Sequence, residues 1–297
     1  MRAAAYAPGR VELLGNHTDY NQGVVLAAAI DRGLRVSGER RSDGLITFRS
    51  SSLGEFEIRV PVRNGIPPSA PVGRDSVELG TGWLPWNNDS PPARQSLAPP
   101  FGCQEVWPQS EPRWVNYVLG VVRELLDAGI SIGGFSAQIE GDLPFGCGLS
   151  SSAALEVATA FFLLKLFDAR LSPIEIAKLC QRAEHRFVGV RSGLLDQVTS
   201  IFGRAEHAVF FDARSEEVRT IPFPPGLALI IAECGKNREL AAGLYNERRE
   251  ETQAAAAALG LVALRDDSQS CLHTGRWEYY RRLDDGSRMS REVQVRF

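Results

Sequence analysis

A glycine- and serine-rich loop that runs directly into an apolar helix is the feature that most constrains this chain. Residues 141–156 read Gly-Asp-Leu-Pro-Phe-Gly-Cys-Gly-Leu-Ser-Ser-Ser-Ala-Ala-Leu-Glu, and an apolar helix is predicted from Ala153 to about Leu166. Such a loop directs free backbone N–H groups and the positive end of the helix dipole at one spot, which suits a phosphate. The serines add hydroxyls for phosphate oxygens or Mg²⁺. A serine-capped loop that binds nothing has the same composition, so the loop alone leaves both interpretations open.

The composition is that of a globular protein without a basic surplus. Hydrophobic residues make up 44% of the 297 residues and the net charge is −3, so nothing favours nucleic-acid binding. Five scattered cysteines without a CxxC pair argue against a disulfide framework or a zinc site. Because the N-terminus lacks a signal-type apolar core and no apolar run is long enough for a membrane span, we expect a soluble, cytoplasmic protein.

A dense polar loop, Asn16–Gly23, lies between two segments that are expected to be strands, Val11–Leu14 and Val24–Ile30. The loop concentrates carboxylate, imidazole, amide and hydroxyl groups within a few residues, and such groups hydrogen-bond polyols well. A hairpin turn is also rich in Asn, Asp and Gly. The loop by itself is therefore compatible with either a sugar site or an ordinary turn.

Asp196 is surrounded in the sequence by apolar residues such as Leu195 and Val198. A carboxylate in such a segment needs a partner if it is buried, and Arg10 is a candidate. An aspartate near a helix start is also favoured by the helix dipole without any further role. The residues alone leave the two interpretations equal.

The remaining chain alternates between regular and irregular segments. Ten of the 17 prolines lie in the surface excursion between Pro67 and Pro112, which shows no sustained periodicity. The run Glu247–Glu251 is expected to be a solvated helix face with ion pairs. Further helices are predicted over Val115 to Ala128, Ser172 to Phe187 (with a capping box at Ser172 and Glu175) and Asn237 to Leu259, and strands at Phe135–Glu140, His207–Phe211 and Leu227–Ala232.

Three stretches together resemble the galactokinase branch of the GHMP small-molecule kinases. Residues 9–21, Gly-Arg-Val-Glu-Leu-Leu-Gly-Asn-His-Thr-Asp-Tyr-Asn, are similar to the sugar-binding signature of that family. Residues 143–153, Leu-Pro-Phe-Gly-Cys-Gly-Leu-Ser-Ser-Ser-Ala, are similar to its ATP loop. Residues 183–189 and 193–197 resemble its catalytic segment. The resemblance covers residues 1–63 and 114 to about 265.

The resemblance implies an α+β fold with two domains and an active site between them. Residues 1–205 would form the N-terminal GHMP kinase domain of the ribosomal-S5-like type, with the Pro/Trp-rich stretch at about 64–113 as an insertion. Residues 206–297 would form a partial ferredoxin-like C-terminal domain. The protein is expected to act as a monomer, without nucleic acid or membrane partners.

The resemblance also implies a reaction, in which the γ-phosphoryl group of ATP is transferred to the 1-hydroxyl of α-D-galactose with Mg²⁺ as cofactor. Arg10 and Asp196 would be the catalytic pair, with Asp196 accepting or orienting the hydroxyl proton and Arg10 drawing off charge. Ser152 would supply a hydroxyl to Mg²⁺. The sugar is assigned to Asn16, His17, Asp19, Gly193 and Tyr245. The nucleotide is assigned to Pro144, Gly146, Gly148, Leu149, Ser150, Ser151 and Ser152.

Two departures from the family pattern keep alternatives open. Asn16 stands where the family usually has glutamate, so a sibling kinase for N-acetylgalactosamine, arabinose or another sugar is a second interpretation. The family's C-terminal glycine-rich motif has no counterpart in these 297 residues, so we expect a truncated chain. A non-catalytic protein that binds galactose and ATP is therefore a third interpretation.

Overall fold

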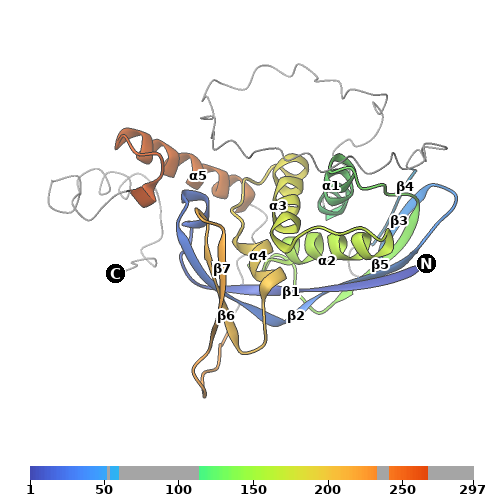
Figure 1. Ribbon diagram of the computed structural model, residues 1–297, viewed down its shortest axis with the longest axis horizontal. Coiled ribbons are helices and arrows are strands. Elements are labelled where there is room, and N and C mark those ends of the chain that lie inside the picture. Colours follow the sequence, from blue (N-terminus) through green and yellow to red (C-terminus); the bar gives the residue numbers. More distant parts are fainter. Residues whose placement is uncertain (52–53, 60–113, 233–240, 267–297) are drawn as a thin grey trace, which may run out of the picture.

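The computed structural model describes residues 1–51, 54–59, 114–232 and 241–266 (Figure 1). Seven strands in these ranges form one mixed sheet. The strands are β1 (Arg2–Leu14), β2 (Val24–Arg40), β3 (Leu45–Ser50), β4 (Gly54–Arg59), β5 (Phe135–Gly141), β6 (His207–Asp212) and β7 (Glu217–Pro222). The α-helices are α1 (Trp114–Asp127), α2 (Ser151–Leu166), α3 (Pro173–Ala183), α4 (Leu195–Phe202) and α5 (Ala241–Ala258). Single turns lie at Asp19–Asn21, Glu184–Val188 and Leu264–Asp266.

The long strand β2 organises the sheet. It pairs with β1 over most of its length, and it also pairs with β5 near its C-terminal end and with β6 near its N-terminal end. The strand order is β4-β3-β5-β2-β6-β7, with β1 paired to β2 off this path. Only β3 and β5 run parallel among the paired strands of the described ranges. This topology matches a mixed α+β fold, as expected from the sequence.

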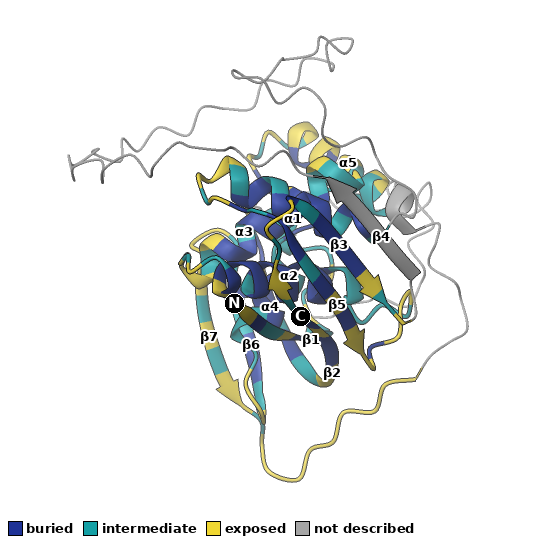
Figure 2. Cartoon of the chain, turned by 90° about the vertical axis from the view of Figure 1, so that its right-hand side faces the viewer, coloured by how far each residue is buried: buried dark blue, intermediate teal, exposed yellow. Residues whose placement is uncertain are grey.

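Helices α1, α2 and α3 lie on one side of the sheet (Figure 1). Helix α2 packs directly on β1 and β2, and it also contacts α1 and α3. Almost every residue of α2 after its first two serines is buried, which explains why its sequence is apolar on all sides. The dark blue interior of Figure 2 lies between these helices and the sheet. Helix α3 begins with the predicted capping box, since Glu175 N donates to Ser172 Oγ and Ser172 N donates to Glu175 Oε2.

Several predicted boundaries differ from the structure. The third predicted helix ends as an α-helix at Ala183 and continues as a π-helical turn, Glu184–Val188. The predicted strand Leu227–Ala232 is wrong, because these residues form no strand and Ile230 is 92% exposed. The predicted domain division at residue 205 stays a prediction, although the sheet continues past it through β6 and β7.

Other predictions fall outside the described residues. The insertion at about 64–113 and the last part of the predicted C-terminal domain 206–297, from residue 267 onward, belong to this group. None of the helices in the described ranges combines the length and apolar character needed to cross a bilayer.

A buried polar cluster joins α2, the π-helical turn Glu184–Val188 and α4. The amide nitrogen of Gln197 donates to Glu156 Oε2 at 3.1 Å and to Glu184 Oε2 at 3.4 Å. Glu184 also accepts a hydrogen bond from the hydroxyl of Ser192. Desolvation raises the pKa of Glu156 well above its ordinary value and raises the pKa of Glu184 to about 7. Glu184 therefore holds its proton at pH values where an exposed glutamate is ionised.

The aromatic cluster around Phe135 is expected to contribute strongly to the stability of the fold. The Phe135 ring is fully buried and packs edge-to-face on Phe48 at 5.2 Å and on Phe162 at 5.9 Å. Phe135→Ala should lower the free energy of unfolding by about 3–5 kcal/mol, measured by urea denaturation. Phe145→Ala, at a 39% exposed position, is the control and should change it by less than about 0.5 kcal/mol. Equal effects in both variants would contradict this account of the core.

The buried Glu184 carboxyl predicts how stability depends on pH. Because its pKa is raised to about 7, the native state keeps a proton that the unfolded chain releases near its ordinary value of 4.5. Stability from this proton is complete below pH 4.5 and is lost as the pH rises through 7, by on the order of 3 kcal/mol. Glu184→Gln should flatten the fall in unfolding free energy between pH 5 and pH 7.5. The control variant Glu206→Gln, at an exposed position, should show the same fall in unfolding free energy as the wild type. An unchanged pH dependence in Glu184→Gln would contradict the raised pKa of Glu184.

Candidate active site

The glycine loop between β5 and α2 adopts a backbone that few other sequences could. Gly146 and Gly148 have φ values of 76° and 77°, and Ser150 also lies in the left-handed region at 56°. Ser150 is the N-cap of α2, yet its own side chain forms no capping hydrogen bond. The first N–H groups of α2 therefore lack the acceptor that an N-cap serine usually supplies, which is the condition for binding an anion.

Arg10 and Asp196 meet beside this loop. Arg10 Nε donates to Asp196 Oδ1 at 2.7 Å, and Arg10 Nη2 lies 2.6 Å from the same oxygen. Arg10 also holds the loop, because Nη1 donates to the Gly148 carbonyl at 2.8 Å and its backbone N donates to the Leu149 carbonyl at 3.1 Å. The contact that the sequence left open between Arg10 and Asp196 is therefore present, and it is joined to the loop.

Ser150 supplies a contact to Asp196 that sequence reasoning missed. Its hydroxyl donates to Asp196 Oδ2 at 2.7 Å, so that each oxygen of this carboxylate has a partner. The left-handed backbone of Ser150 turns the hydroxyl away from the helix N–H groups that an N-cap serine usually serves. Ser151 and Ser152, which open α2, are partly exposed beside it, and Pro144 begins the loop.

The polar loop between β1 and β2 is ordered by its own hydrogen bonds. His17 has a φ of 62°, and its carbonyl accepts a hydrogen bond from Asn21 Nδ2 at 2.8 Å. The Thr18 hydroxyl lies 2.7 Å from the Gly15 carbonyl and from the Val24 carbonyl. The loop is therefore both a tight turn and a rigid support for the side chains of His17 and Asp19.

Asp19 contacts the segment that precedes Asp196. Its Oδ2 accepts a hydrogen bond from Leu195 N at 3.3 Å, and a Cβ atom added at Gly193 would lie only 1.7 Å from the same oxygen. Glycine is required at position 193 because the carboxylate occupies the space of a side chain. Desolvation and the negative charge of Asp196 raise the pKa of Asp19 to about 6.

Three aromatic rings surround the polar loop. The rings of His17, Tyr20 and Tyr245 lie 5.4–5.7 Å apart in all three pairs. The Tyr245 hydroxyl accepts a hydrogen bond from Gly193 N at 3.4 Å. The structure thus brings His17, Asp19, Gly193, Asp196 and Tyr245 together, as predicted. Asn16 is exposed and forms no hydrogen bond with any described residue.

Helix α5 carries Tyr245 to this place, and its docking corrects one expectation. Asn246 Oδ1 accepts from Arg191 N at 2.9 Å, and Arg249 Nη1 donates to the Arg191 carbonyl at 2.7 Å. The guanidinium of Arg249 lies 5.9 Å from the ring centroid of Tyr20. The run 247–251 is therefore not uniformly a solvated face, because Arg249 is turned inward while Glu250 pairs with Arg191 on the exposed side.

The polar residues Tyr20, Glu156, Glu184 and Gln197 were not predicted to have a role, and Ser150 was predicted as a nucleotide contact but not as a partner of Asp196. The signal for two of them was available, because Glu156 interrupts an otherwise apolar helix and Glu184 follows another. A charged residue in such a place is buried only with partners. The signal for Ser150 was absent, since its hydroxyl leaves the helix only through a backbone conformation that serine rarely adopts.

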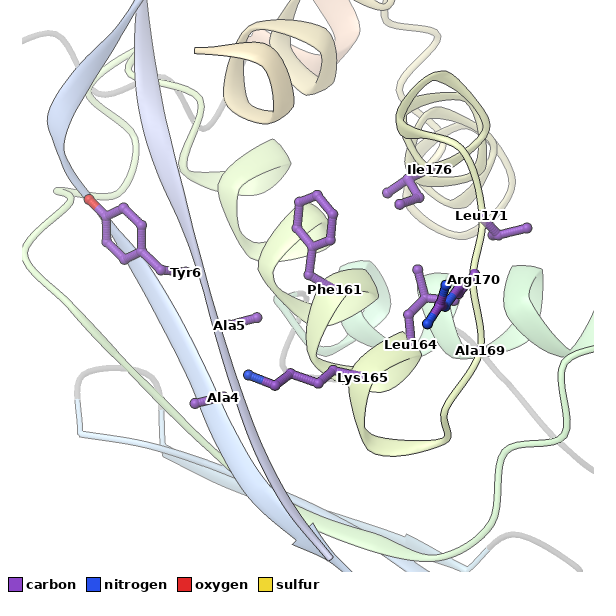
Figure 3. A pocket seen from close by; sticks show the side chains of 10 residues that line it. All are labelled: Ala4, Ala5, Tyr6, Phe161, Leu164, Lys165, Ala169, Arg170, Leu171 and Ile176. Atoms are coloured by element: carbon purple, nitrogen blue, oxygen red, sulfur yellow. The ribbon is translucent and has the colours of Figure 1, made fainter. Parts of the chain in front are cut away.

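Two surface pockets lie in the described part of the chain, one away from Asp196 and one beside the glycine loop. One open pocket lies between β1, α2 and the segment entering α3, with Tyr6, Lys165 and Arg170 among its polar lining (Figure 3). None of its lining residues belongs to the set around Asp196. A second pocket borders the glycine loop at Pro144, Cys147 and Leu149. In the described part of the chain, no group of three or more His, Cys, Asp or Glu side chains could hold a metal ion.

Comparison with known proteins agrees with this geometry. Residues 116–204 match the family description "GHMP kinases N terminal domain", and residues 2–40 match "Galactokinase galactose-binding signature". These two ranges contain the glycine loop, the Arg10–Asp196 pair and the polar loop.

Individual relatives are similar over most of this chain. It is 36% identical over 271 residues to a galactokinase of Roseiflexus sp. (strain RS-1), covering 90% of this chain and 58% of that protein. It is 37% identical over 264 residues to a galactokinase of Homo sapiens, covering 89% and 58%. The fold superposes on the crystal structure of Lactococcus lactis galactokinase complexed with galactose with a TM-score of 0.66 and 28% identity, covering 95% of this chain and 62% of that chain.

The chain thus spans about three fifths of the length of these relatives, namely 58–60% of the curated ones. Within that span it shares their mixed α+β fold and carries both of the matched regions. The chain belongs to the GHMP kinase family, on its galactokinase branch.

Proposed function

We propose that this protein is a galactokinase, which transfers the γ-phosphoryl group of ATP to the 1-hydroxyl of α-D-galactose and yields galactose 1-phosphate and ADP. The observation that carries the proposal is the Arg10–Asp196 pair, which lies between the glycine loop and the polar loop. Phosphoryl transfer requires that the two substrates are aligned with each other. It also needs one group that accepts the hydroxyl proton and one that stabilises negative charge. The pair is bonded to the glycine loop, and Leu195, next to Asp196, is bonded to Asp19 of the polar loop, so the pair is placed for these two tasks.

The glycine loop is the proposed phosphate side of the site. The uncapped N–H groups at the start of α2 and the positive end of its dipole favour the triphosphate. The left-handed glycines allow the backbone to approach phosphate oxygens closely. The proposed nucleotide contacts are Pro144, Gly146, Gly148, Leu149, Ser150, Ser151 and Ser152.

The polar loop and α5 form the proposed sugar side. Asp19 and Asp196 offer carboxylate oxygens to sugar hydroxyls, and the aromatic rings of His17 and Tyr245 enclose the same space. The L. lactis structure that this fold matches is complexed with galactose, which supports galactose as a ligand of this chain. The proposed sugar contacts are Asn16, His17, Asp19, Gly193 and Tyr245.

In the proposed reaction Asp196 accepts or orients the proton of the sugar 1-hydroxyl as its oxygen attacks the γ-phosphorus. Arg10 stabilises the negative charge on Asp196 and on the transferring group. The Ser150 hydroxyl holds the second carboxylate oxygen, so that the orientation of Asp196 is set from both sides. Both substrates are bound in a fixed geometry, which supplies most of the acceleration in this class of reaction.

Mg²⁺ fits this site in the way it usually binds nucleotides. Magnesium keeps several waters and takes few protein ligands beside the phosphate oxygens, so a dedicated carboxylate cage is not needed. The Ser152 hydroxyl, at the partly exposed start of α2, is the proposed protein contact. When bound, the ion neutralises phosphate charge.

The organisation of the whole protein is part of the same proposal. We assign residues 1–205 to the N-terminal GHMP kinase domain and residues 206–297 to part of a C-terminal domain. Tyr245 then comes from the second domain, and its contact with Gly193 closes the sugar side. A soluble, cytoplasmic monomer is the proposed state.

A sibling sugar kinase is a second candidate because of one observation. Asn16 replaces the glutamate usual in the family, and its side chain is exposed at the edge of the polar loop without a described partner. A neutral amide at this edge would accept a substituted or shorter sugar that a carboxylate disfavours. N-acetylgalactosamine and arabinose are therefore the sugars to compare with galactose.

An ATP-dependent phosphorylation assay over a sugar panel tests the proposed function. The full chain is incubated with ATP, Mg²⁺ and galactose, N-acetylgalactosamine, arabinose or glucose, and formation of ADP and sugar phosphate is followed. Galactose should have the highest kcat/KM. Preference for another sugar would favour the sibling kinase, and binding of galactose and ATP without turnover would favour a non-catalytic binding protein.

Asp196→Asn tests the proposed role of the carboxylate. The substitution keeps the shape but removes the proton acceptor, so kcat should fall by at least ~10²-fold, as expected for lost acid–base catalysis. Steady-state kinetics with galactose and ATP give the measurement. Asp43→Asn, at the exposed turn between β2 and β3, is the matched control and should keep wild-type turnover. Near-wild-type kcat in Asp196→Asn would overturn the assignment.

Gly193→Ala tests the contact between the sugar side and α4. The added methyl group would collide with Asp19, so the carboxylate must move away from its place beside Leu195. The KM for galactose should rise by ~10- to 100-fold, as expected for a displaced binding group. Gly133→Ala is the control, because its Cβ would meet no atom closer than 3.7 Å. An unchanged galactose KM in Gly193→Ala would show that Asp19 does not bind the sugar.

A further inference from the structure

Tyr20 forms a hydrogen bond that neither the reaction nor the sugar contacts assigned above make use of. Its hydroxyl lies 2.8 Å from His17 Nδ1, and the two rings meet edge-to-face. Tyr20 belongs to the single 3₁₀ turn Asp19–Asn21, three residues after His17. The same turn therefore carries the proposed sugar-binding residues and the tyrosine that contacts one of them.

The position of Tyr20 is tightly determined. The Tyr245 ring packs on it edge-to-face at 5.4 Å, and the Arg249 guanidinium lies 5.9 Å from its centroid. On the other side of the hydrogen bond, the left-handed backbone of His17 is held by Asn21. Neither partner can move without breaking contacts with α5 or with the turn, so the bond is a fixed feature of the loop.

The direction of this hydrogen bond follows from the protonation of the two groups. Desolvation and the nearby charge of Asp19 raise the pKa of Tyr20, so its hydroxyl keeps its hydrogen. Desolvation, together with the positive charge of Arg248, lowers the pKa of His17, so its ring is neutral at pH 7. A neutral imidazole has one N–H group and one bare nitrogen, and which nitrogen carries the proton depends on the partner of the other.

We propose that Tyr20 is a positioning residue that sets the tautomer of His17: the phenol donates to Nδ1, so that Nε2 carries the ring proton and donates to a hydroxyl oxygen of the bound sugar. This inference rests on the proposed function for its ligand. Nε2 has no hydrogen-bond partner among the described residues, so it is free to contact the sugar.

The hydrogen-bonding needs of a sugar favour this assignment. A sugar hydroxyl both donates and accepts, whereas the carboxylate oxygens of Asp19 and Asp196 only accept. Hydroxyls that donate to these carboxylates leave oxygen lone pairs that require donors. An Nε2–H group on His17 supplies one, while the opposite tautomer would add another acceptor. The hydroxyl of Tyr20 thus makes the imidazole complementary to its acidic neighbours.

Nitrogen NMR of the histidine ring tests the tautomer without any turnover. The full chain, labelled with ¹⁵N-histidine, contains only four histidines, and His17 is identified by comparison with His17→Gln. Long-range ¹H–¹⁵N spectra at pH 7 should show His17 as the Nε2–H tautomer in the wild type. Tyr20→Phe should shift its two ring nitrogens toward a mixture of tautomers. Tyr6→Phe, at an exposed position on β1, is the control and should leave them unchanged.

Galactose kinetics test the consequence for binding. Tyr20→Phe should raise the KM for galactose on the order of tenfold, the loss expected for one hydrogen bond, with kcat within about threefold of wild type. An Nδ1–H tautomer in the wild type, or an unchanged tautomer in a folded Tyr20→Phe, would overturn the inference. If the wild type shows no turnover on galactose, the proposed function fails, and the NMR spectra alone then decide the role of Tyr20.

Discussion

The ion pair between Arg10 and Asp196 joins parts of the chain that lie almost two hundred residues apart, since Arg10 is on β1 and Asp196 is in the first turn of α4. Through Gly148 and Leu149 the same arginine is bonded to the glycine loop, and through Ser150 the loop returns to Asp196. The loop, the strand and the helix therefore cannot be placed independently. The Arg10–Asp196 pair is charge-assisted and has little solvent exposure. Removing one of the two residues would therefore leave an uncompensated charge in the site.

Around this pair the protein raises the pKa values of other carboxyl groups. Desolvation raises the pKa of Asp19 to about 6 and that of Glu184 to about 7, and the charge of Asp196 contributes to both shifts. Gln197, the neighbour of Asp196, connects Glu184 to Glu156 in the buried layer behind the site. Acidic residues can accumulate here because burial suppresses their ionisation, while Arg10 lies beside the carboxylate assigned to catalysis.

Motifs predicted more of the site than patterns of hydrophobicity did. Segments 9–21, 143–153 and 193–197 were expected to meet, and they do. The contact from Ser150 was not predicted, because it depends on a left-handed backbone that no sequence pattern announces. Arg249 was assigned to solvent because its charge pattern suits an exposed helix, whereas docking of α5 on residues 189–193 turns it inward. The apolar run 227–232 predicted a strand, but a strand also needs a partner to pair with, and these residues pair with no strand of the described chain.

The central claim is that the Arg10–Asp196 pair lies between a sugar on one side and the phosphates of ATP on the other. A crystal structure of the full chain with galactose and a non-hydrolysable ATP analogue tests it most directly. We expect the 1-hydroxyl of galactose within hydrogen-bond distance of Asp196, and the γ-phosphate on the N–H groups that begin α2. A sugar bound away from Asp196, or phosphates away from the glycine loop, would contradict the account.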